Sequence, residues 1–543
     1  MCVRRLLTAL ILACAALAAP AAQQRPRLVV IVVVDQFRAD YLNTFAAHWR
    51  GGFRTLLAEG AVFRRAAYPY LHTDTCAGHF TISTGTLPST HGMIADTWWN
   101  ADEKSVIECT DDGTSPSVSY GRPSGWGKSG RNLLVPTIGD QLREQQRDSR
   151  VVALSMKARG AIGLAGHGGA AVTWFEETPG VGGFMTARAF AAQPVVPVKA
   201  FIERDPYEKE FGRAWTLRDA ADAYRFADAG IGERPAAPWT GVFPHEPRIA
   251  GSAPERWNAD NEMALWRSSP YSDAYLGRMA IALIDAFALG QRDATDVLGV
   301  SFSATDFVGH SFGPDSREVE DTVARLDDTL GALIAHLDAR VGRTNYVLAL
   351  SADHGASPIA VTKDAGRVAT EDIRERIEEI LTTHFGPRTG GRYTLAGGDN
   401  VTLAPGVMAR LRTQPAAMSA IERAVTAIPG VDRVLRRDAL SEQSSDAIVR
   451  AAALSAMEGR SGDLIIITKP YWYLTSRNTT TATGHGTGYD YDQRVPVILF
   501  GAGIKAGQYD NAATPADIAP TLARLANVAL PKAEGRVLAE ALR

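Results

Sequence analysis

Acidic residues and histidines of this chain gather where short apolar runs end. In open α/β sheets, ligands bind beyond the carboxyl ends of the strands, so side chains at such positions converge. Mixed carboxylate and imidazole donors suit zinc or a similar divalent ion. A turn or a surface loop explains each residue singly, but four such places together favour metal binding. The candidate ligands are Asp35, Asp306, His310, Asp353, His354 and His485.

A hydroxyl group that could act as a nucleophile lies in the segment Thr73-Asp-Thr-Cys-Ala-Gly-His79. This segment precedes a helical pattern that begins near Phe80. The N-terminal end of a helix carries partial positive charge, which favours an alkoxide and a phosphoryl group. A metal ion in contact would lower the pKa of the hydroxyl further. Thr75 is therefore the candidate nucleophile, a role compatible with capping the helix, and Cys76 is its rival.

Two cationic residues follow another apolar run. Lys157 and Arg159 come just after residues 151–154. An arginine can bind two phosphoryl oxygens through its planar fork, and a lysine can act as a point charge on a transferring oxygen. A solvated basic loop is the alternative explanation. Their place after a predicted strand favours a role in binding an anion.

The elements that must position these residues alternate along the chain. The continuous β-branched run 28–34 predicts a strand that is covered on both faces. Similar runs recur at 151–154, 297–303, 346–351, 464–468 and 497–500. Helical patterns lie between them, one capped by Ser316 and others at 275–289 and 371–385. This alternation predicts an α/β fold with a mostly parallel central sheet and helices on both faces.

Three stretches depart from this rhythm. Residues 97–135 are rich in Trp, Ser, Gly and Asp, and residues 160–260 hold many Gly, Pro and aromatic residues. We interpret both stretches as insertions into the core. Residues 357–460 carry helical and strand patterns of their own, and they lie between the candidate ligands Asp353-His354 and His485. They predict an inserted cap.

The N-terminus has the pattern of an export signal over residues 1–21. Arg4 and Arg5 precede the apolar run 6–19, which is short for a membrane span, and small residues follow it. A buried N-terminal helix and a lipoprotein anchor at Cys14 are the alternatives. We expect residues 22–543 to form one catalytic domain that is exported, either to the periplasm or outside the cell, without a stable membrane anchor.

Composition narrows the classes of function. The 543 residues are 45% hydrophobic and 22% charged, which excludes a disordered chain, a collagen and a coiled coil. A net charge of -3 without a basic run predicts action on a small molecule and no nucleic-acid partner. Cys76 and Cys109, which remain after export, could form a disulfide, although the sequence cannot show that they lie close enough. The oligomeric state is not fixed by the sequence, and we expect a monomer.

Taken together, these motifs resemble the alkaline phosphatase superfamily, and within it the threonine-nucleophile, phosphate-irrepressible alkaline phosphatases (PafA type). The resemblance runs from Val29 to about Pro531, and the order and spacing of its motifs make it specific. It implies a three-layer alkaline-phosphatase-like sandwich with inserted cap segments. The motifs are Asp35, Thr75-x-x-Gly-His79, Lys157-Ala-Arg159, Asp306-x-x-x-His310, Asp353-His354-Gly355 and His485-Gly-Thr-Gly-Tyr-Asp490.

The resemblance also implies a division of ligands between two zinc ions about 4 Å apart, as in other two-metal sites. One ion would be held by Asp306, His310 and His485. The other would be held by Asp35, Asp353, His354 and the Thr75 oxygen. The implied activity is hydrolysis of small phosphate monoesters through a phosphothreonine on Thr75, with Lys157 and Arg159 binding the phosphoryl group. Other divalent metals remain possible.

Asp96 departs from the family pattern. Matched from Thr75, the family's phosphate-contacting asparagine falls on this residue. An ionised carboxylate there would repel each unit of negative charge on a phosphate by about 1–4 kcal/mol at about 4 Å. Three outcomes stay open: the carboxyl is protonated, it turns away, or it pairs with Lys157 or another cation. Asp96 is kept as a candidate site residue that could also alter substrate preference.

Three competing functions follow from the same residues. A phosphodiesterase or nucleotide pyrophosphatase of the same superfamily would share the metals and Thr75, and Asp96 weakens the case for a monoester. A sulfatase would need an oxidisable residue in a Cys/Ser-x-Pro/Ala-x-Arg motif, and the segment starting at Cys76 lacks the arginine. An exported binding protein with structural metals would leave a hydroxyl at a helix start beside an open metal site unexplained.

Overall fold

The core of the molecule is one large twisted sheet. The computed structural model describes residues 25–121, 126–177, 182–247, 259–361 and 364–543. Within these ranges ten strands form the main sheet, in the order β18-β2-β17-β10-β1-β9-β6-β7-β8-β5. They are β1 (Leu28–Val34), β2 (Ala61–Ala66), β5 (Ser117–Ser119), β6 (Val151–Ser155), β7 (Ala171–Glu176), β8 (Gly183–Ala187), β9 (Asp296–Phe302), β10 (Tyr346–Ser351), β17 (Val497–Gly501) and β18 (Gly507–Ala513).

The strand β1 forms the middle of this sheet because all seven of its residues are apolar and buried. It pairs in parallel with β9 on one side and β10 on the other. Successive side chains point to opposite faces, so Val30 and Val32 enter one core while Val29 and Ile31 enter the other. A strand covered on both faces reads as a continuous hydrophobic run, as the sequence predicts.

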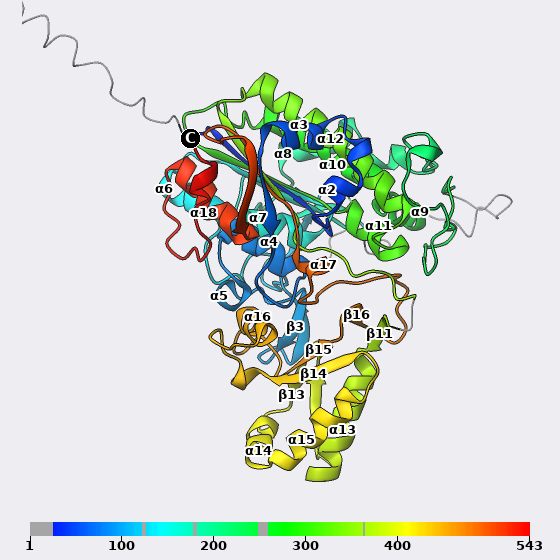
Figure 1. Ribbon diagram of the computed structural model, residues 1–543. Coiled ribbons are helices and arrows are strands. Elements are labelled where there is room, and N and C mark those ends of the chain that lie inside the picture. The colour runs from blue at the N-terminus through cyan, green and yellow to red at the C-terminus, as the bar shows by residue number, and fades with distance from the viewer. Residues whose placement is uncertain (1–24, 122–125, 178–181, 248–258, 362–363) are drawn as a thin grey trace, which may run out of the picture.

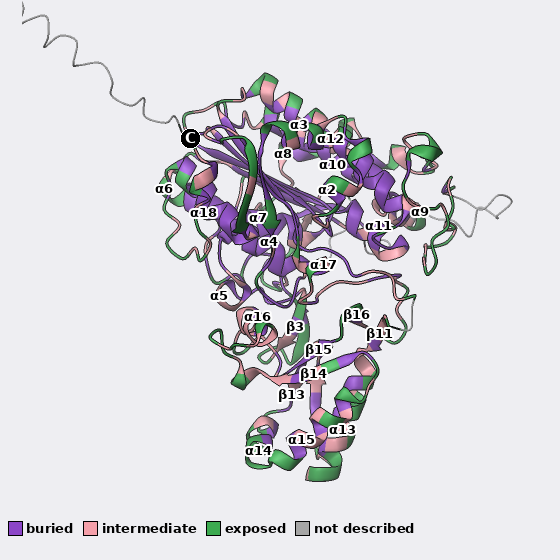
Figure 2. Ribbon diagram, in the orientation of Figure 1, coloured by how far each residue is buried: buried purple, intermediate pink, exposed green. Residues whose placement is uncertain are grey.

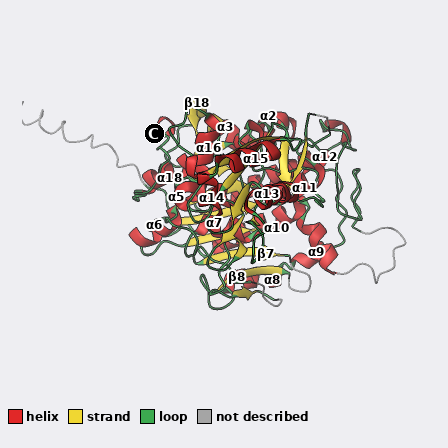
Figure 3. Ribbon diagram, turned by 90° about the horizontal axis from the view of Figure 1, so that it is seen from below, coloured by secondary structure: helices red, strands yellow, loops and turns green. Residues whose placement is uncertain are grey.

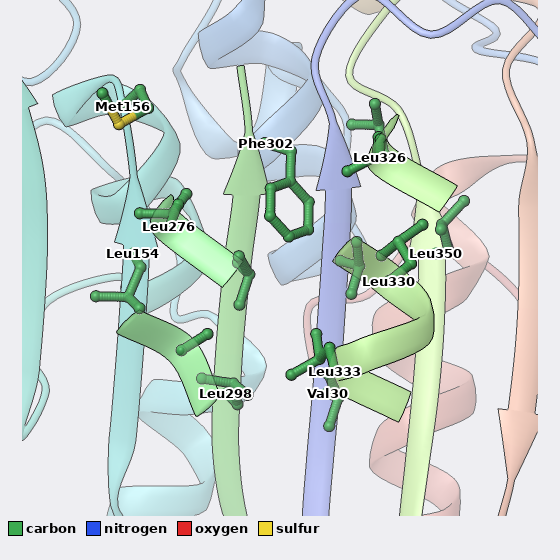
Figure 4. Close-up of a cluster of buried hydrophobic side chains, with 14 of the residues drawn as sticks. Val30, Leu154, Met156, Leu276, Leu298, Phe302, Leu326, Leu330, Leu333 and Leu350 are labelled. Atoms are coloured by element: carbon green, nitrogen blue, oxygen red, sulfur yellow. The ribbon is translucent and has the colours of Figure 1, made fainter. Parts of the chain in front are cut away.

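Helices cover both faces, which confirms the predicted mostly parallel α/β sheet (Figure 1). One face carries α3 (Gly52–Glu59), α10 (Pro270–Ala286) and α12 (Arg317–Arg340). The other carries α4 (Thr75–Thr84), α6 (Ile138–Gln145), α7 (Ala158–Ala165) and α18 (Ile518–Ala526). Figure 4 shows Leu326, Leu330 and Leu333 of α12 and Leu276 of α10 over the strands of the first face. Figure 2 shows the central strands of the sheet as buried and the edge strand β18 as largely exposed.

Strand direction corrects one simplification of the sequence analysis. The pairings of β17 with β10 and with β2 are antiparallel, although the apolar run of β17 resembles the parallel strands. Because β17 runs the other way, its start lies at the sheet edge where β1, β9 and β10 end. The loop that precedes β17 therefore reaches the same edge as the loops that follow those three strands.

The predicted cap is a separate lobe below the main sheet in Figure 1. Within the described part of the chain it has a four-stranded sheet, β12-β13-β15-β14, and a two-stranded one, β11-β16. The run 464–468 is therefore a strand of the cap, and the cap continues to residue 475. Its elements are β11 (Gly366–Ala369), α13 (Thr370–Phe385), β12 (Thr394–Ala396), β13 (Asn400–Leu403), α14 (Val407–Thr413), α15 (Pro415–Thr426), β14 (Val431–Arg436), α16 (Ala447–Ser455), β15 (Leu464–Thr468) and β16 (Trp472–Thr475).

The cap has its own core between α13, α15 and the small sheet. In the view from below, the cap helices lie in front of the main sheet (Figure 3). A second, smaller cluster joins Leu71 of the main lobe to Ile465 and Ile467 of β15. The cap is thus anchored close to the segment that contains Thr75.

The two other insertions differ from the prediction in their bounds. The stretch 97–135 forms a hairpin of β3 (Thr97–Asn100) and β4 (Ser105–Glu108), followed by loops and β5. The stretch 160–260 begins inside the core, because α7, β7 and β8 belong to the main fold. Its irregular part follows residue 187 and includes α8 (Val196–Arg204). Apolar runs as short as β7 and β8 between glycine-rich loops gave no clear strand signal.

Several predicted elements are present with small changes at their ends. The helix predicted from Ser316 is α12, and the Ser316 hydroxyl accepts a hydrogen bond from the Val319 N–H at 3.2 Å. Residues 1–21, predicted as a signal peptide, lie outside the described residues. No helix in the described part of the chain has both the length and the apolarity needed to cross a bilayer.

Candidate active site

Three carboxylates lie together because three neighbouring strands end at one edge of the sheet. The register pairs Val34 of β1 with Phe302 of β9, and Val33 with Ser351 of β10. Asp35, Asp306 and Asp353 follow the last residues of these strands by one, four and two positions. All three carboxylates are buried. The convergence at this edge is the one that the sequence predicts.

The helix α11 (Ala304–Phe312) adds an imidazole to this group. Asp306 and His310 lie one turn apart on it, and His310 Nε2 lies 3.2 Å from Asp306 Oδ1. Gln36, which sequence reasoning missed, donates from its side chain to Asp306 at 2.8 Å and from its backbone N–H to Asp353 at 3.1 Å. A Cβ on Gly309 would lie 2.0 Å from the Gln36 side chain, so a larger residue there would displace the amide that donates to Asp306. The one available signal was that Gln36 directly follows Asp35.

The loop before β17 brings the last predicted ligand to the site. His485 stacks on His354 with ring centroids 3.6 Å apart, and its Nε2 lies 3.9 Å from Asp306 Oδ1. This placement depends on the antiparallel direction of β17, since a parallel strand would start at the opposite edge of the sheet.

The three histidines share one hydrogen-bonding arrangement. In each ring Nδ1 lies 2.9–3.0 Å from a main-chain carbonyl oxygen. A carbonyl only accepts, so Nδ1 carries the proton and Nε2 keeps a lone pair when the ring is neutral. Metal-binding histidines are oriented in this way. The rings and their acceptors are His310 with Thr483, His354 with Gly355, and His485 with Thr73.

Thr75 is the first residue of α4, which starts five residues earlier than the sequence pattern indicates. Its side chain is fully buried, and its Oγ1 has no hydrogen-bond partner among the described residues. A Cβ on Gly78 would lie 2.3 Å from the Asp353 carbonyl oxygen, so α4 packs directly against the strand end that holds two candidate ligands. His79 fixes the helix by contacts with the Thr75 carbonyl at 2.9 Å and Ser301 Oγ at 2.8 Å.

Both predicted cations lie at the site, and each meets a carboxylate. Lys157, at the N-cap of α7, places its Nζ 2.6 Å from Asp35 Oδ2 and 2.6 Å from Asp306 Oδ2. Arg159 Nε lies 3.0 Å from Asp96 Oδ2. Asp96 Oδ1 accepts a hydrogen bond from the Cys76 N–H at 2.8 Å. The sequence leaves three outcomes open for Asp96, and the structure shows the third, in which its carboxylate pairs with a cation. That cation is Arg159 and not Lys157.

The two cysteines form a disulfide, with Cα atoms 6.6 Å apart. The Cys109 N–H also donates to the Asp96 carbonyl at 2.9 Å. Because its sulfur is bonded to Cys109, Cys76 is not available as a nucleophile or as the residue that a sulfatase would oxidise. Sequence alone left this pairing open, since it depends on how the hairpin folds back onto α4.

Burial and neighbouring charges shift the ionisation of the site in opposite directions. Burial, followed by repulsion from Asp306 and Asp353, holds the pKa of Asp35 well above its usual range. Burial acts the same way on Asp306, but the Lys157 ammonium overcomes it and holds the pKa of Asp306 well below its usual range. Burial lowers the pKa of His354 to about 3. Burial opposes protonation of His485 too, but hydrogen bonding and attraction to Asp74 raise its pKa to about 10.

These side chains fit a pair of divalent metal ions. There are two sets of donor atoms, and within each set the atoms lie within 4.8 Å of one another. One set is Asp306, His354 and His485, and the other is Asp35, Asp353 and His354. His354 belongs to both sets, whereas the sequence-based division gave it to the second alone and placed His310 in the first. Several buried donor atoms make no hydrogen bond within the described chain, and a cation would satisfy them. They are Asp35 Oδ1, His354 Nε2 and Thr75 Oγ1.

Similarity to known proteins extends over nearly the whole chain. The model of the type I phosphodiesterase / nucleotide pyrophosphatase family matches residues 29–490. Alkaline phosphatase PhoV of Synechococcus elongatus is 31% identical, with 96% of this chain and 94% of PhoV covered. Alkaline phosphatase PafA of Elizabethkingia meningoseptica is 30% identical, with 95% of each chain covered.

Solved structures agree with this sequence similarity. The crystal structure of wild-type alkaline phosphatase PafA superposes with a TM-score of 0.86 at 29% identity, covering 96% of this chain and 100% of PafA. The predicted resemblance is thereby confirmed at the level of family and fold. The chain belongs to the type I phosphodiesterase / nucleotide pyrophosphatase family, within the alkaline phosphatase superfamily.

Proposed function

We propose that this protein is an exported, metal-dependent phosphomonoesterase of the alkaline phosphatase type that uses two zinc ions and Thr75 as its nucleophile. The observation that carries the proposal is the buried Thr75 hydroxyl, unpartnered within the described chain, at the start of α4 beside the carboxylate and imidazole cluster. The names of PhoV and PafA, relatives of similar length at about 30% identity, support the same activity.

In the proposed mechanism the ester is hydrolysed by two successive displacements at phosphorus, and different residues of the chain act in each. Thr75 Oγ attacks phosphorus in line, so a new P–O bond forms to Thr75 as the bond to the departing alcohol breaks. The N-terminal end of α4 and the guanidinium of Arg159 hold the phosphoryl oxygens. A water molecule then attacks phosphorus, the bond from phosphorus to Thr75 Oγ breaks, and inorganic phosphate leaves as Thr75 regains its hydroxyl proton. When bound, the divalent ions supply positive charge to the nucleophile and to the departing oxygen.

The residues that would hold the ions are those predicted from the sequence. Asp306, His310 and His485 would hold one ion, and Asp35, Asp353, His354 and Thr75 the other. Zinc suits these donors, because carboxylate oxygens and imidazole nitrogens are common zinc ligands and thiols are absent from the set. Lys157 bridges Asp35 and Asp306 in the structure and supplies positive charge next to the metal ligands.

A phosphodiesterase is the second candidate, and one observation favours it. Arg159, the cation best suited to a doubly charged phosphoryl group, is paired with Asp96. A diester carries one negative charge fewer, so it needs less positive charge in the site. The name of the matching family also includes this activity.

The test is metal analysis combined with rates on two matched substrates. Purified mature protein is assayed with 4-nitrophenyl phosphate and with its methyl ester, which share a leaving group. We expect about two zinc ions per chain and a larger kcat/KM for the monoester. Faster hydrolysis of the methyl ester would assign the phosphodiesterase activity instead. A zinc-loaded, folded protein that hydrolyses neither ester would overturn both assignments.

A further inference from the structure

Asp96 occupies a position where an external anion would be expected to bind. Its carboxylate accepts a hydrogen bond from the N–H of Cys76, the second residue of α4, and contacts the guanidinium of Arg159. Backbone N–H groups in the first turn of a helix and an arginine are both typical phosphate ligands. The protein thus places an anion of its own next to Thr75.

This anion is held at both its side chain and its backbone. Cys76 donates to the Asp96 carboxylate, and Cys109 donates to the Asp96 carbonyl at 2.9 Å. The two donors are joined by the disulfide. The hairpin that follows closes the same loop, because Thr97 of β3 pairs with Glu108 of β4. Turning the Asp96 carboxylate away from Arg159 would break its hydrogen bond with Cys76, and the disulfide-bonded loop holds the backbone of Asp96 in place.

Both cations near Thr75 are already paired with carboxylates of the chain. Lys157 lies between Asp35 and Asp306, and Arg159 lies against Asp96. Attraction to Arg159 and the hydrogen bond from Cys76 outweigh burial and lower the pKa of Asp96, so its carboxylate stays ionised. With half-buried side chains, Asp96 and Arg159 both remain open to a ligand. An arriving phosphoryl group meets an arginine whose charge is compensated.

We propose that Asp96 is a specificity-determining residue, a fixed negative charge that weakens binding of doubly charged phosphoryl groups relative to singly charged ones. The disfavoured ligands are monoesters and inorganic phosphate, and the relatively favoured ligands are diesters. The effect on reaction rates rests on the proposed function. The effect on phosphate affinity does not, because it depends only on the charge beside Arg159.

The experiment compares Asp96→Asn and Asp96→Ala with the wild type and with Asp102→Asn. Asp102 is exposed in the turn of the same hairpin, so this control removes one negative charge away from Arg159. Two quantities are measured on zinc-loaded protein. One is the ratio of kcat/KM for 4-nitrophenyl phosphate to that for its methyl ester, and the other is the Kd of inorganic phosphate by titration calorimetry. The calorimetry is repeated on metal-free protein.

Both Asp96 variants are expected to raise the ratio and to tighten phosphate binding by about tenfold, equivalent to about 1.4 kcal/mol. Asp102→Asn is expected to leave both quantities at the wild-type values. An increase in Asp96→Asn alone would show that the new amide donor is the cause, and it would overturn the charge-based proposal. Unchanged ratios and phosphate affinities in both Asp96 variants would overturn it as well.

The two measurements separate this inference from the proposed function. Tighter phosphate binding in both Asp96 variants without turnover of either ester would support the role of Asp96 and reject the phosphatase assignment. Ready turnover of the monoester with an unchanged ratio and unchanged phosphate affinity would support the phosphatase assignment and reject the role of Asp96.

Discussion

The imidazole rings of His354 and His485 stack, with centroids 3.6 Å apart and planes 16° apart. His354 follows a central strand, and His485 lies on the loop before an antiparallel strand. Each ring donates its Nδ1–H to a carbonyl, so both Nε2 atoms are available as ligands beside Asp306. The stack therefore joins two distant segments into one donor set, and the chemistry of the site depends on it.

Thr75→Ala should abolish phosphoenzyme formation and turnover, because the first turn of α4 carries no other hydroxyl group. Thr75→Ser should keep both. The phosphoenzyme is trapped by acid quench after mixing with a monoester and located by peptide mass spectrometry. Thr84→Ala, which removes a hydroxyl from the far end of the same helix, is the control and should still be phosphorylated. Turnover by Thr75→Ala near the wild-type rate would exclude the threonine mechanism.

Lys157→Met should destabilise the metal-free protein strongly and the zinc-loaded protein much less. The Lys157 ammonium lies between two buried carboxylates, and removing one partner of a buried ion pair costs about 3–5 kcal/mol. Bound zinc would supply the missing positive charge. The free energy of unfolding is measured in urea with chelator and with excess zinc. An equal loss under both conditions would show that the ions do not bind next to Asp35 and Asp306.

Replacing both cysteines by serine should lower the free energy of unfolding by about 3–4 kcal/mol, as expected for a disulfide that closes a loop of this length. The bonded residues are separated by 33 positions. Guanidinium unfolding of the double variant is compared with that of the wild type, without reductant. As a control, added reductant should destabilise the wild type and leave the variant unchanged. Equal stability of the two proteins without reductant would argue that the bond does not form.

A buried pair outside the active site predicts a pH dependence of stability. Burial raises the pKa of Glu318 from 4.5 to about 8 and lowers that of His245 from 6.5 to about 4. His245 Nε2 lies 3.0 Å from Glu318 Oε1. Folded Glu318 keeps its proton, so its contribution to stability falls as pH rises from 4.5 to 8. Folded His245 stays neutral, so its contribution grows as pH rises from 4 to 6.5.

The two contributions oppose each other below pH 6.5, and above it only that of Glu318 changes. Wild-type protein should therefore lose about 2 kcal/mol between pH 6.5 and 8 relative to Glu318→Gln, which cannot titrate. Urea unfolding at several pH values measures the difference, with the exposed Glu442→Gln as the control. Parallel stability curves for the wild type and Glu318→Gln over this range would contradict the prediction.

Much of the fold could be predicted because the signals are local. The run 28–34 is uniformly apolar, and its strand has a neighbour on each side and a core on each face. The helix after Ser316 has an apolar stripe and a capping hydroxyl, and both are present in α12. The run 464–468 has the same local pattern as the central strands, yet it pairs with strands of the cap. A strand's partners depend on distant segments, so its own residues do not specify them.

The sequence by itself determined which side chains can do chemistry and that most of them follow strand ends. Strand periodicity and residue type are properties of neighbouring residues, so they can be read along the chain. Only the tertiary structure decided that β17 runs antiparallel and delivers His485, that Gln36 bridges two carboxylates, and that Cys76 is bonded to Cys109. It also decided that Asp96 pairs with Arg159. These relationships join segments far apart in the chain, and they form because folding buries charges and polar atoms that must then find partners.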